Sequence, residues 1–119
     1  MAVSDNVKRG SIEIVILTLL KESDMYGYQL SQEMKLRSKG RYSLLESSMY
    51  PSLYRMLDKG LISDRQEKVG KRRVRVYYHL EPAGEEYLEK AKEEYLSLTF
   101  GVLGILGVKK TMEDDDDER

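Results

Sequence analysis

"LISDRQEKVGKRRVRVYYHL", residues 61–80, ends in a strict alternation of side-chain types. Four apolar side chains alternate there with basic or polar ones, at Val74, Val76, Tyr78 and Leu80. A period of two residues is typical of a β-strand with one buried and one solvated face. Residues 61–69 supply an antiparallel partner, with a glycine at the turn between the two strands. The stretch therefore predicts a β-hairpin.

The tip and the solvated face of this hairpin are basic. Lys71, Arg72 and Arg73 follow the turn glycine, and Arg75 lies on the solvated face of the second strand. His79 falls on the same face, so we interpret it as a solvated strand residue rather than a catalytic or metal-binding one. The hairpin tip is therefore a candidate site for an anionic partner.

The segment "SIEIVILTLLK" (11–21) predicts an amphipathic helix with two apolar faces. Ser11 is of the type that caps a helix start. Ile14 and Leu17 place apolar side chains outside the main stripe. A small domain has little structure to cover both faces, so we expect a second subunit to cover one of them.

Two further helices are expected at about 26–39 and 46–62. The first follows Asp24, a capping residue type, and ends near Gly40. Gly27, in its first turn, suggests that another backbone passes close by.

The helix over 46–62 has an outward face suited to contact with a partner. Either Ser47 or Ser48 is expected to cap it, and Gly60 to end it. At about 100° per residue, the side opposite its apolar stripe carries small, aromatic and basic side chains. They are Ser47, Ser48, Pro51, Tyr54 and Arg55, with Tyr50 on the flank.

A long helix is expected over residues 82–110. Apolar or small residues recur in it at alternating spacings of four and three, a pattern typical of a helix seam. The seam consists of Gly84, Leu88, Ala91, Tyr95, Leu98, Val102 and Ile105. A helix of roughly 25 residues is about 37 Å long, more than a small domain needs. We therefore expect it to form a homodimer. A helix that folds back on its own core stays open as the alternative.

Composition favours a binding protein over an enzyme. The chain has one histidine and no cysteine, which leaves no thiolate site, imidazole cluster or Ser-His-Asp triad. We therefore predict no catalytic residues, no metal site and no cofactor. No secretory signal is evident, and no apolar run reaches the roughly 18 residues of a membrane span. We expect a cytoplasmic protein without membrane contact.

The net charge of −1 conceals an uneven distribution. The last seven residues, "EDDDDER", hold six acids and one arginine, a charge of −5, so residues 1–112 carry +4. An acidic run of this kind is typical of a solvated end, and we expect residues 111–119 to be disordered.

Three helices followed by a basic hairpin indicate a winged helix-turn-helix. The predicted fold is thus mainly α with a small β-hairpin: a DNA-binding domain over 1–81, followed by the long dimerisation helix. The helix over 46–62 would enter the major groove of double-stranded DNA, while the hairpin cations bind phosphates without reading sequence. The alternative is a winged-helix module whose basic loop docks on an acidic protein surface.

Three motifs also resemble a known family. "YGYQL" (26–30), "SSMYPSLYRMLDKGLI" (47–62) and "VYYHLEPAGEEYL" (76–88) are similar, in order and spacing, to the PadR family of bacterial transcriptional regulators. The likeness extends from about Ile12 to Leu88. It matches the short form of the family, which has one C-terminal dimerisation helix.

The resemblance implies a homodimeric repressor that leaves a palindromic operator when a small aromatic or hydrophobic effector binds. Tyr50 and Pro51 match the recognition-helix motif of the family, and residues 70–73 match its wing tip. Tyr95 and Phe100 are candidates for an effector pocket, or pack within the seam. The residues expected at an effector site or dimer interface are Ile14, Leu17, Tyr95, Leu98, Phe100 and Val102.

Overall fold

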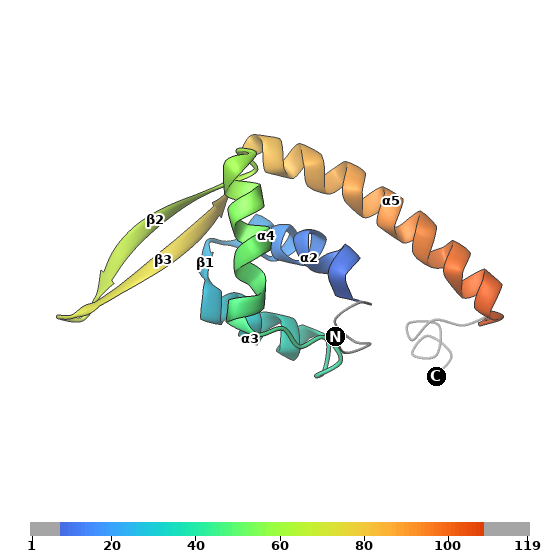
Figure 1. Ribbon diagram of the computed structural model, residues 1–119, viewed down its shortest axis with the longest axis horizontal. Coiled ribbons are helices and arrows are strands. Elements are labelled where there is room, and N and C mark those ends of the chain that lie inside the picture. The colour runs from blue at the N-terminus through green and yellow to red at the C-terminus, as the bar shows by residue number, and fades with distance from the viewer. Residues whose placement is uncertain (1–7, 109–119) are drawn as a thin grey trace.

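The computed structural model describes residues 8–108 and combines a cluster of short helices, a small sheet and one long helix (Figure 1). The elements are η1 (Arg9–Ser11), α2 (Ile12–Glu22), β1 (Met25–Tyr26), α3 (Gly27–Arg37), α4 (Glu46–Asp58), β2 (Ile62–Val69), β3 (Arg73–Leu80) and α5 (Pro82–Leu106). This architecture confirms the predicted winged-helix fold. The predicted acidic tail (111–119) lies outside the described residues, as do the last two residues of the helix expected over 82–110. Between residues 8 and 108, no helix is long and apolar enough to cross a membrane.

The core lies where α2, α3 and α4 meet the base of the sheet. Its fully buried side chains are Ile16, Leu17, Leu30, Met49, Leu53 and Met56. The expectation for Leu17 was wrong. It is buried within its own chain, where α5 packs along α2, so it has no surface to offer a second subunit or an effector.

The sheet has three antiparallel strands in the order β1, β3, β2. The hairpin of β2 and β3, called the wing below, turns at Gly70, whose φ of 78° favours glycine. Its outer half extends beyond the helices, so Val74, expected on a buried face, is 54% exposed (Figure 1). Tyr78, near the base, is buried as expected. The short strand β1 was not predicted.

The serines expected as helix caps do not act as caps. Ser11 precedes α2, but its hydroxyl donates to the carbonyl of Lys8 and lies 2.8 Å from the Tyr42 hydroxyl. α4 begins earlier than expected, after Leu45, so Ser47 and Ser48 lie within its first turn. At both helix starts the residue type is suited to capping, but no serine hydroxyl among the described residues accepts a hydrogen bond from the first turn of the helix.

The start of α5 is fixed against the junction between α4 and β2. The Glu81 N–H donates to the Leu61 carbonyl at 3.0 Å, and a side chain at Gly84 would overlap that same carbonyl oxygen. From this point α5 runs away from the wing (Figure 1). Its first turns are covered, with Leu88 only 3% exposed, whereas Ile105 near its end is 88% exposed.

Candidate nucleic-acid interface

One face of α4 is buried and the opposite face is open to solvent, as its sequence predicts. Its core side is anchored by Met49, Leu53 and Met56. The exposed side carries Ser47, Ser48, Pro51 and Tyr54, with Tyr50 half-buried beside them. The N-terminal part of the helix therefore presents hydroxyl groups and an aromatic ring on a rigid support.

Tyr50 is held in place by contacts on both sides. Its hydroxyl donates to the Glu46 carboxylate at 3.0 Å, and its ring stacks on Tyr54 with centroids 6.0 Å apart. The hydrogen bond to Glu46, together with burial, raises the pKa of Tyr50, so the phenol stays protonated. Gly27 of α3 leaves room for this carboxylate, since a Cβ there would lie 2.7 Å from Glu46 Oε2. The close neighbour of Gly27 is thus a side chain, and not the backbone that the sequence suggested.

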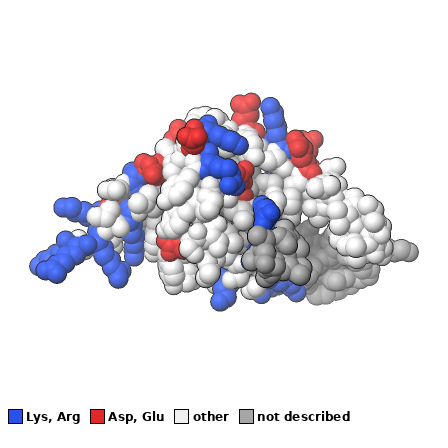
Figure 2. Space-filling view, in the orientation of Figure 1, with Lys and Arg blue, Asp and Glu red and all other residues white. Residues whose placement is uncertain are grey.

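The wing tip is the second exposed part of the interface. Lys71, Arg72 and Arg73 are all exposed, and basic side chains gather at this end of the molecule (Figure 2). The wing projects from the body, so these cations can approach a phosphate backbone without steric hindrance from the helices.

Two arginines predicted at this interface are engaged elsewhere. The Arg75 guanidinium lies over the Tyr26 ring, 4.2 Å from its centroid. Arg55 turns toward α2, with its Nε 3.3 Å from Glu13 Oε2. The structure therefore directs Arg75 toward β1 and Arg55 toward α2, so each guanidinium already has a partner within the chain.

A hollow of about 450 Å³ separates the start of α4 from the wing. Tyr50, Tyr54 and Tyr78 line it, together with the carboxylates of Glu46 and Asp64. Burial raises the pKa of Tyr78 to about 12, so this phenol is neutral at ordinary pH. The hollow also holds one cation, Arg75, but its two carboxylates give it a net negative charge. The wing tip, with three cations, is therefore better suited to DNA phosphates.

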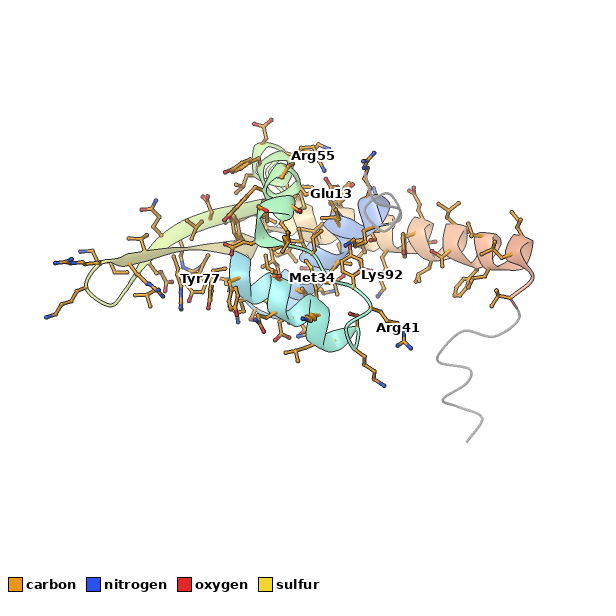
Figure 3. The ribbon with its side chains drawn as sticks, turned by 60° about the horizontal axis from the view of Figure 1, so that its bottom comes forward. Glu13, Met34, Arg41, Arg55, Tyr77 and Lys92 are labelled. Carbon is orange, nitrogen blue, oxygen red and sulfur yellow. The ribbon has the colours of Figure 1, made fainter. Side chains whose placement is uncertain are left out.

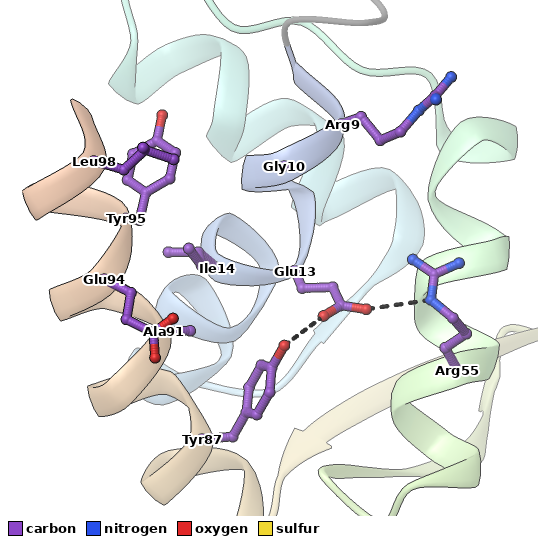
Figure 4. A pocket seen from close by; sticks show the side chains of 10 residues that line it. All are labelled: Arg9, Gly10, Glu13, Ile14, Arg55, Tyr87, Ala91, Glu94, Tyr95 and Leu98. Atoms are coloured by element: carbon purple, nitrogen blue, oxygen red, sulfur yellow. Dashed lines mark hydrogen bonds and ion pairs between the residues drawn. The ribbon is translucent and has the colours of Figure 1, made fainter. Parts of the chain in front are cut away.

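A larger cavity, of about 570 Å³, lies among α2, α4 and α5 (Figure 4). It brings together three of the residues predicted at an effector site or dimer interface: Ile14, Tyr95 and Leu98. Phe100 and Val102 lie farther along α5, where they are 59% and 45% exposed. Apart from Leu17, which is buried in the core, the predicted set is therefore divided between this cavity and the free end of α5.

Four polar residues of this cavity were not predicted from the sequence: Arg9, Glu13, Tyr87 and Glu94. Glu13 and Tyr87 interact directly. The Tyr87 hydroxyl donates to Glu13 Oε1 at 3.0 Å, while Arg55 approaches the other oxygen of the same carboxylate (Figure 4). Burial, followed by the hydrogen bond to Glu13, raises the pKa of Tyr87. The one signal in the sequence is Glu13 itself, an acid in the first turn of a largely apolar helix.

His79 is 53% exposed on its side chain and lies beside Asp24, with Nδ1 2.7 Å from Oδ1. Within residues 8–108, no group of three or more His, Asp or Glu side chains is arranged to hold a metal ion.

Known proteins are similar to this chain in both sequence and fold. Residues 16–90 match the model of the transcriptional regulator PadR-like family. A transcriptional regulator from Clostridium thermocellum is 30% identical, with a TM-score of 0.75 over 83% of this chain and 95% of that one. PadR from Bacillus subtilis, solved in complex with operator DNA, is 27% identical, with a TM-score of 0.61 over 66% of this chain and 44% of its own. The transcriptional regulator YqjI from Escherichia coli (strain K12) is 29% identical over 85 residues, 71% of this chain and 39% of that protein. The chain thus spans less than half the length of the last two proteins.

Proposed function

The chain belongs to the PadR-like family of transcriptional regulators, and from this membership we propose that it binds operator DNA as a homodimer and represses transcription. The start of α4 enters the major groove, and the wing tip binds the adjacent phosphate backbone. The observation that supports this proposal most strongly is the exposure of both surfaces in a fold shared with a regulator solved on its operator.

The two surfaces make different contributions to binding. Lys71, Arg72 and Arg73 contact phosphates, which gives affinity that falls with salt and carries no sequence information. Ser47, Ser48 and Tyr54 approach base edges or phosphates from the first turns of α4. Tyr50 supports Tyr54 by stacking, because its hydroxyl is already bonded to Glu46.

The second half of α5 provides the dimer interface. Leu98, Val102 and Ile105 belong to the predicted seam and are 68%, 45% and 88% exposed in the single chain. Phe100 is 59% exposed but lies two residues from both Leu98 and Val102, so its side chain points to the other side of the helix. Burial of apolar area of this kind stabilises association. In the dimer, two wings and two α4 helices face successive turns of one operator.

The cavity among α2, α4 and α5 suits a small aromatic effector with a polar group. Ile14 and Leu98 offer apolar contacts, while Tyr95 and the Glu13 carboxylate offer an aromatic face and a hydrogen-bond acceptor. Glu13 contacts both Tyr87 of α5 and Arg55 of α4. An effector that displaces this carboxylate therefore shifts the recognition helix and releases the operator.

Selection of bound sequences from random duplex DNA tests the proposal. We expect the full chain to enrich a palindrome whose half-sites lie about one helical turn apart, roughly 34–36 Å. In transcription from a promoter that carries the enriched site, added protein should lower the yield of transcript. A chain that enriches no duplex would instead be a winged-helix module that binds protein.

A further inference from the structure

Six side chains form a continuous series of contacts across β1, β2 and β3, and two of them, Arg75 and Tyr26, also line the hollow between α4 and the wing. We propose that this series, called the wing ladder here, positions the wing for DNA without contacting DNA itself. Its members, in order of contact, are Arg75, Tyr26, Tyr77, Arg65, Asp24 and His79. The inference rests on the proposed DNA binding and assigns a role to residues outside the DNA-contacting surfaces.

The upper part of the ladder consists of aromatic rings and guanidinium groups. The Arg75 guanidinium lies 4.2 Å from the centroid of Tyr26, and the rings of Tyr26 and Tyr77 meet edge to face at 5.4 Å. The Arg65 guanidinium lies 5.3 Å from the centroid of Tyr77. Tyr77 lies on the opposite side of the sheet from α4 (Figure 3). Cation–π and edge-to-face contacts are directional, so each one restricts the orientation of its neighbour.

The lower part of the ladder fastens both wing strands to the body. Asp24 accepts a hydrogen bond from Arg65 of β2, and its other oxygen lies 2.7 Å from His79 Nδ1 of β3. Asp24 directly precedes β1, which pairs with β3 at only two positions, Met25 with Tyr78 and Tyr26 with Tyr77. One short segment of the body therefore reaches both strands of the wing.

The wing needs such support because its outer half lacks contact with the core. Val74 is 54% exposed although it lies on the same face of β3 as the buried Tyr78. The tip begins at Arg73, four residues beyond Tyr77, or about 13 Å along an extended strand. A tilt of about 10° at the base therefore displaces the start of the tip by about 2 Å, comparable to the tolerance of a hydrogen bond to phosphate.

Positioning and direct contact have different signatures in a binding experiment. If the ladder fixes the wing, its loss lowers the fraction of molecules that are ready to bind, and the apparent Kd rises by the inverse of that fraction. The bound state keeps the same phosphate contacts, so the slope of log K against log salt is unchanged. A residue that contacts phosphate instead contributes about 0.9 to that slope.

The test compares Tyr26→Leu with Tyr26→Phe, and Arg75→Gln with Arg75→Lys, in the full chain on its selected duplex. We expect Tyr26→Leu and Arg75→Gln each to weaken binding about 5-fold, the size of one or two lost aromatic contacts. Both should keep the wild-type salt slope. The phenylalanine variant should bind like wild type, and the lysine variant should recover part of the loss. The double variant Tyr26→Leu, Arg75→Gln should lose little more than either single variant, because both changes break the same contact.

Hydrogen exchange without DNA provides an independent readout. In Tyr26→Leu, amides of β2 and β3 should exchange faster while those of α2 and α4 keep their protection. The ladder would be refuted if Tyr26→Leu kept wild-type affinity and wild-type exchange. It would also be refuted if Arg75→Gln lowered the salt slope by about 0.9 per wing. If the wild-type chain selects no duplex while Tyr26→Leu still shows faster exchange in β2 and β3, the proposed function is refuted and the ladder stands as a set of contacts that holds the wing.

Discussion

Arg55 of α4 and Glu13 of α2 form an ion pair, with Nε 3.3 Å from Oε2, at the edge of the cavity bounded by α5. The pair directs the guanidinium toward the helical body, and Tyr87 shares the same carboxylate. A cation that the sequence places on the DNA-facing side of α4 thus belongs to the contacts that join α4, α2 and α5.

Removal of Arg55 should change the salt dependence of DNA binding less than removal of a wing-tip arginine. Because the Glu13 carboxylate already compensates the guanidinium, we expect Arg55→Gln to leave the salt slope of operator binding nearly unchanged. Arg73→Gln, a matched change at the tip, should lower that slope by about 0.9 per wing. Anisotropy titrations at several salt concentrations measure the slope for each variant. Equal loss of slope in the two variants would show that Arg55 contacts phosphate.

Charges in the seam of α5 should separate the dimer. Leu98→Glu with Val102→Glu would bury unpaired carboxylates in the proposed interface, although both positions are exposed in one chain. We expect a folded monomer in sedimentation experiments at micromolar concentration.

The control for this experiment changes exposed side chains of the same helix outside the seam, as Lys92→Glu with Ser97→Glu. It should remain dimeric. A dimer that persists with both seam charges would exclude this interface.

Gly84 should tolerate no side chain. In Gly84→Ala the new methyl group would overlap the Leu61 carbonyl oxygen and force the start of α5 away from the α4–β2 junction. Overpacking of this kind lowers the free energy of unfolding by about 1–3 kcal/mol. Denaturant unfolding measures the loss.

Gly101→Ala is the matched control, since a Cβ there meets no atom within 4 Å among the described residues. Alanine favours a helix over glycine by about 1 kcal/mol, so this variant should gain stability. Equal effects at the two glycines would contradict the close approach at Gly84.

The contact of Asp24 with the wing should make stability depend on pH in acid. Burial raises the pKa of Asp24, but the hydrogen bonds to His79 and Arg65 outweigh it, so the folded-state pKa lies below the ordinary value. The ionised carboxylate therefore stabilises the fold above a pH of about 4, and this contribution is lost as pH falls through the folded-state pKa.

In Asp24→Asn, the deficit in unfolding free energy relative to wild type should thus shrink between pH 6 and pH 2. Replacing both donors, as Arg65→Gln with His79→Gln, should flatten the pH dependence in the same way. A deficit that stays constant over this range would show that Arg65 and His79 do not lower the pKa of Asp24 in the folded protein.

Patterns repeated along the chain predicted most of the fold correctly. The period of two in β3 and the glycine at position 70 predicted the hairpin, and the apolar stripe through Met49 and Leu53 predicted the buried face of α4. These features depend on residues close in sequence, so a local pattern is sufficient to find them.

The features that were missed depend on contacts between distant segments. β1 has only two residues and exists because it pairs with β3, about 50 residues later. The partners of Arg55 and Arg75, which are Glu13 and Tyr26, come from other elements, so no spacing in the sequence indicates them. Leu17 was misjudged for the same reason, since the cover for its face comes from its own chain.

The wing tip is the part of the molecule on which the proposed DNA binding depends most directly. Lys71, Arg72 and Arg73 are exposed, and the wing holds them away from the body. The decisive measurement is the salt dependence of binding to the selected operator, for wild type and for the triple change to glutamine. We predict weaker binding to every duplex and a slope reduced by about 0.9 for each lost phosphate contact, or about 2.7 per wing. Unchanged affinity and an unchanged slope in the triple variant would contradict the assignment of this hairpin as a DNA-binding wing.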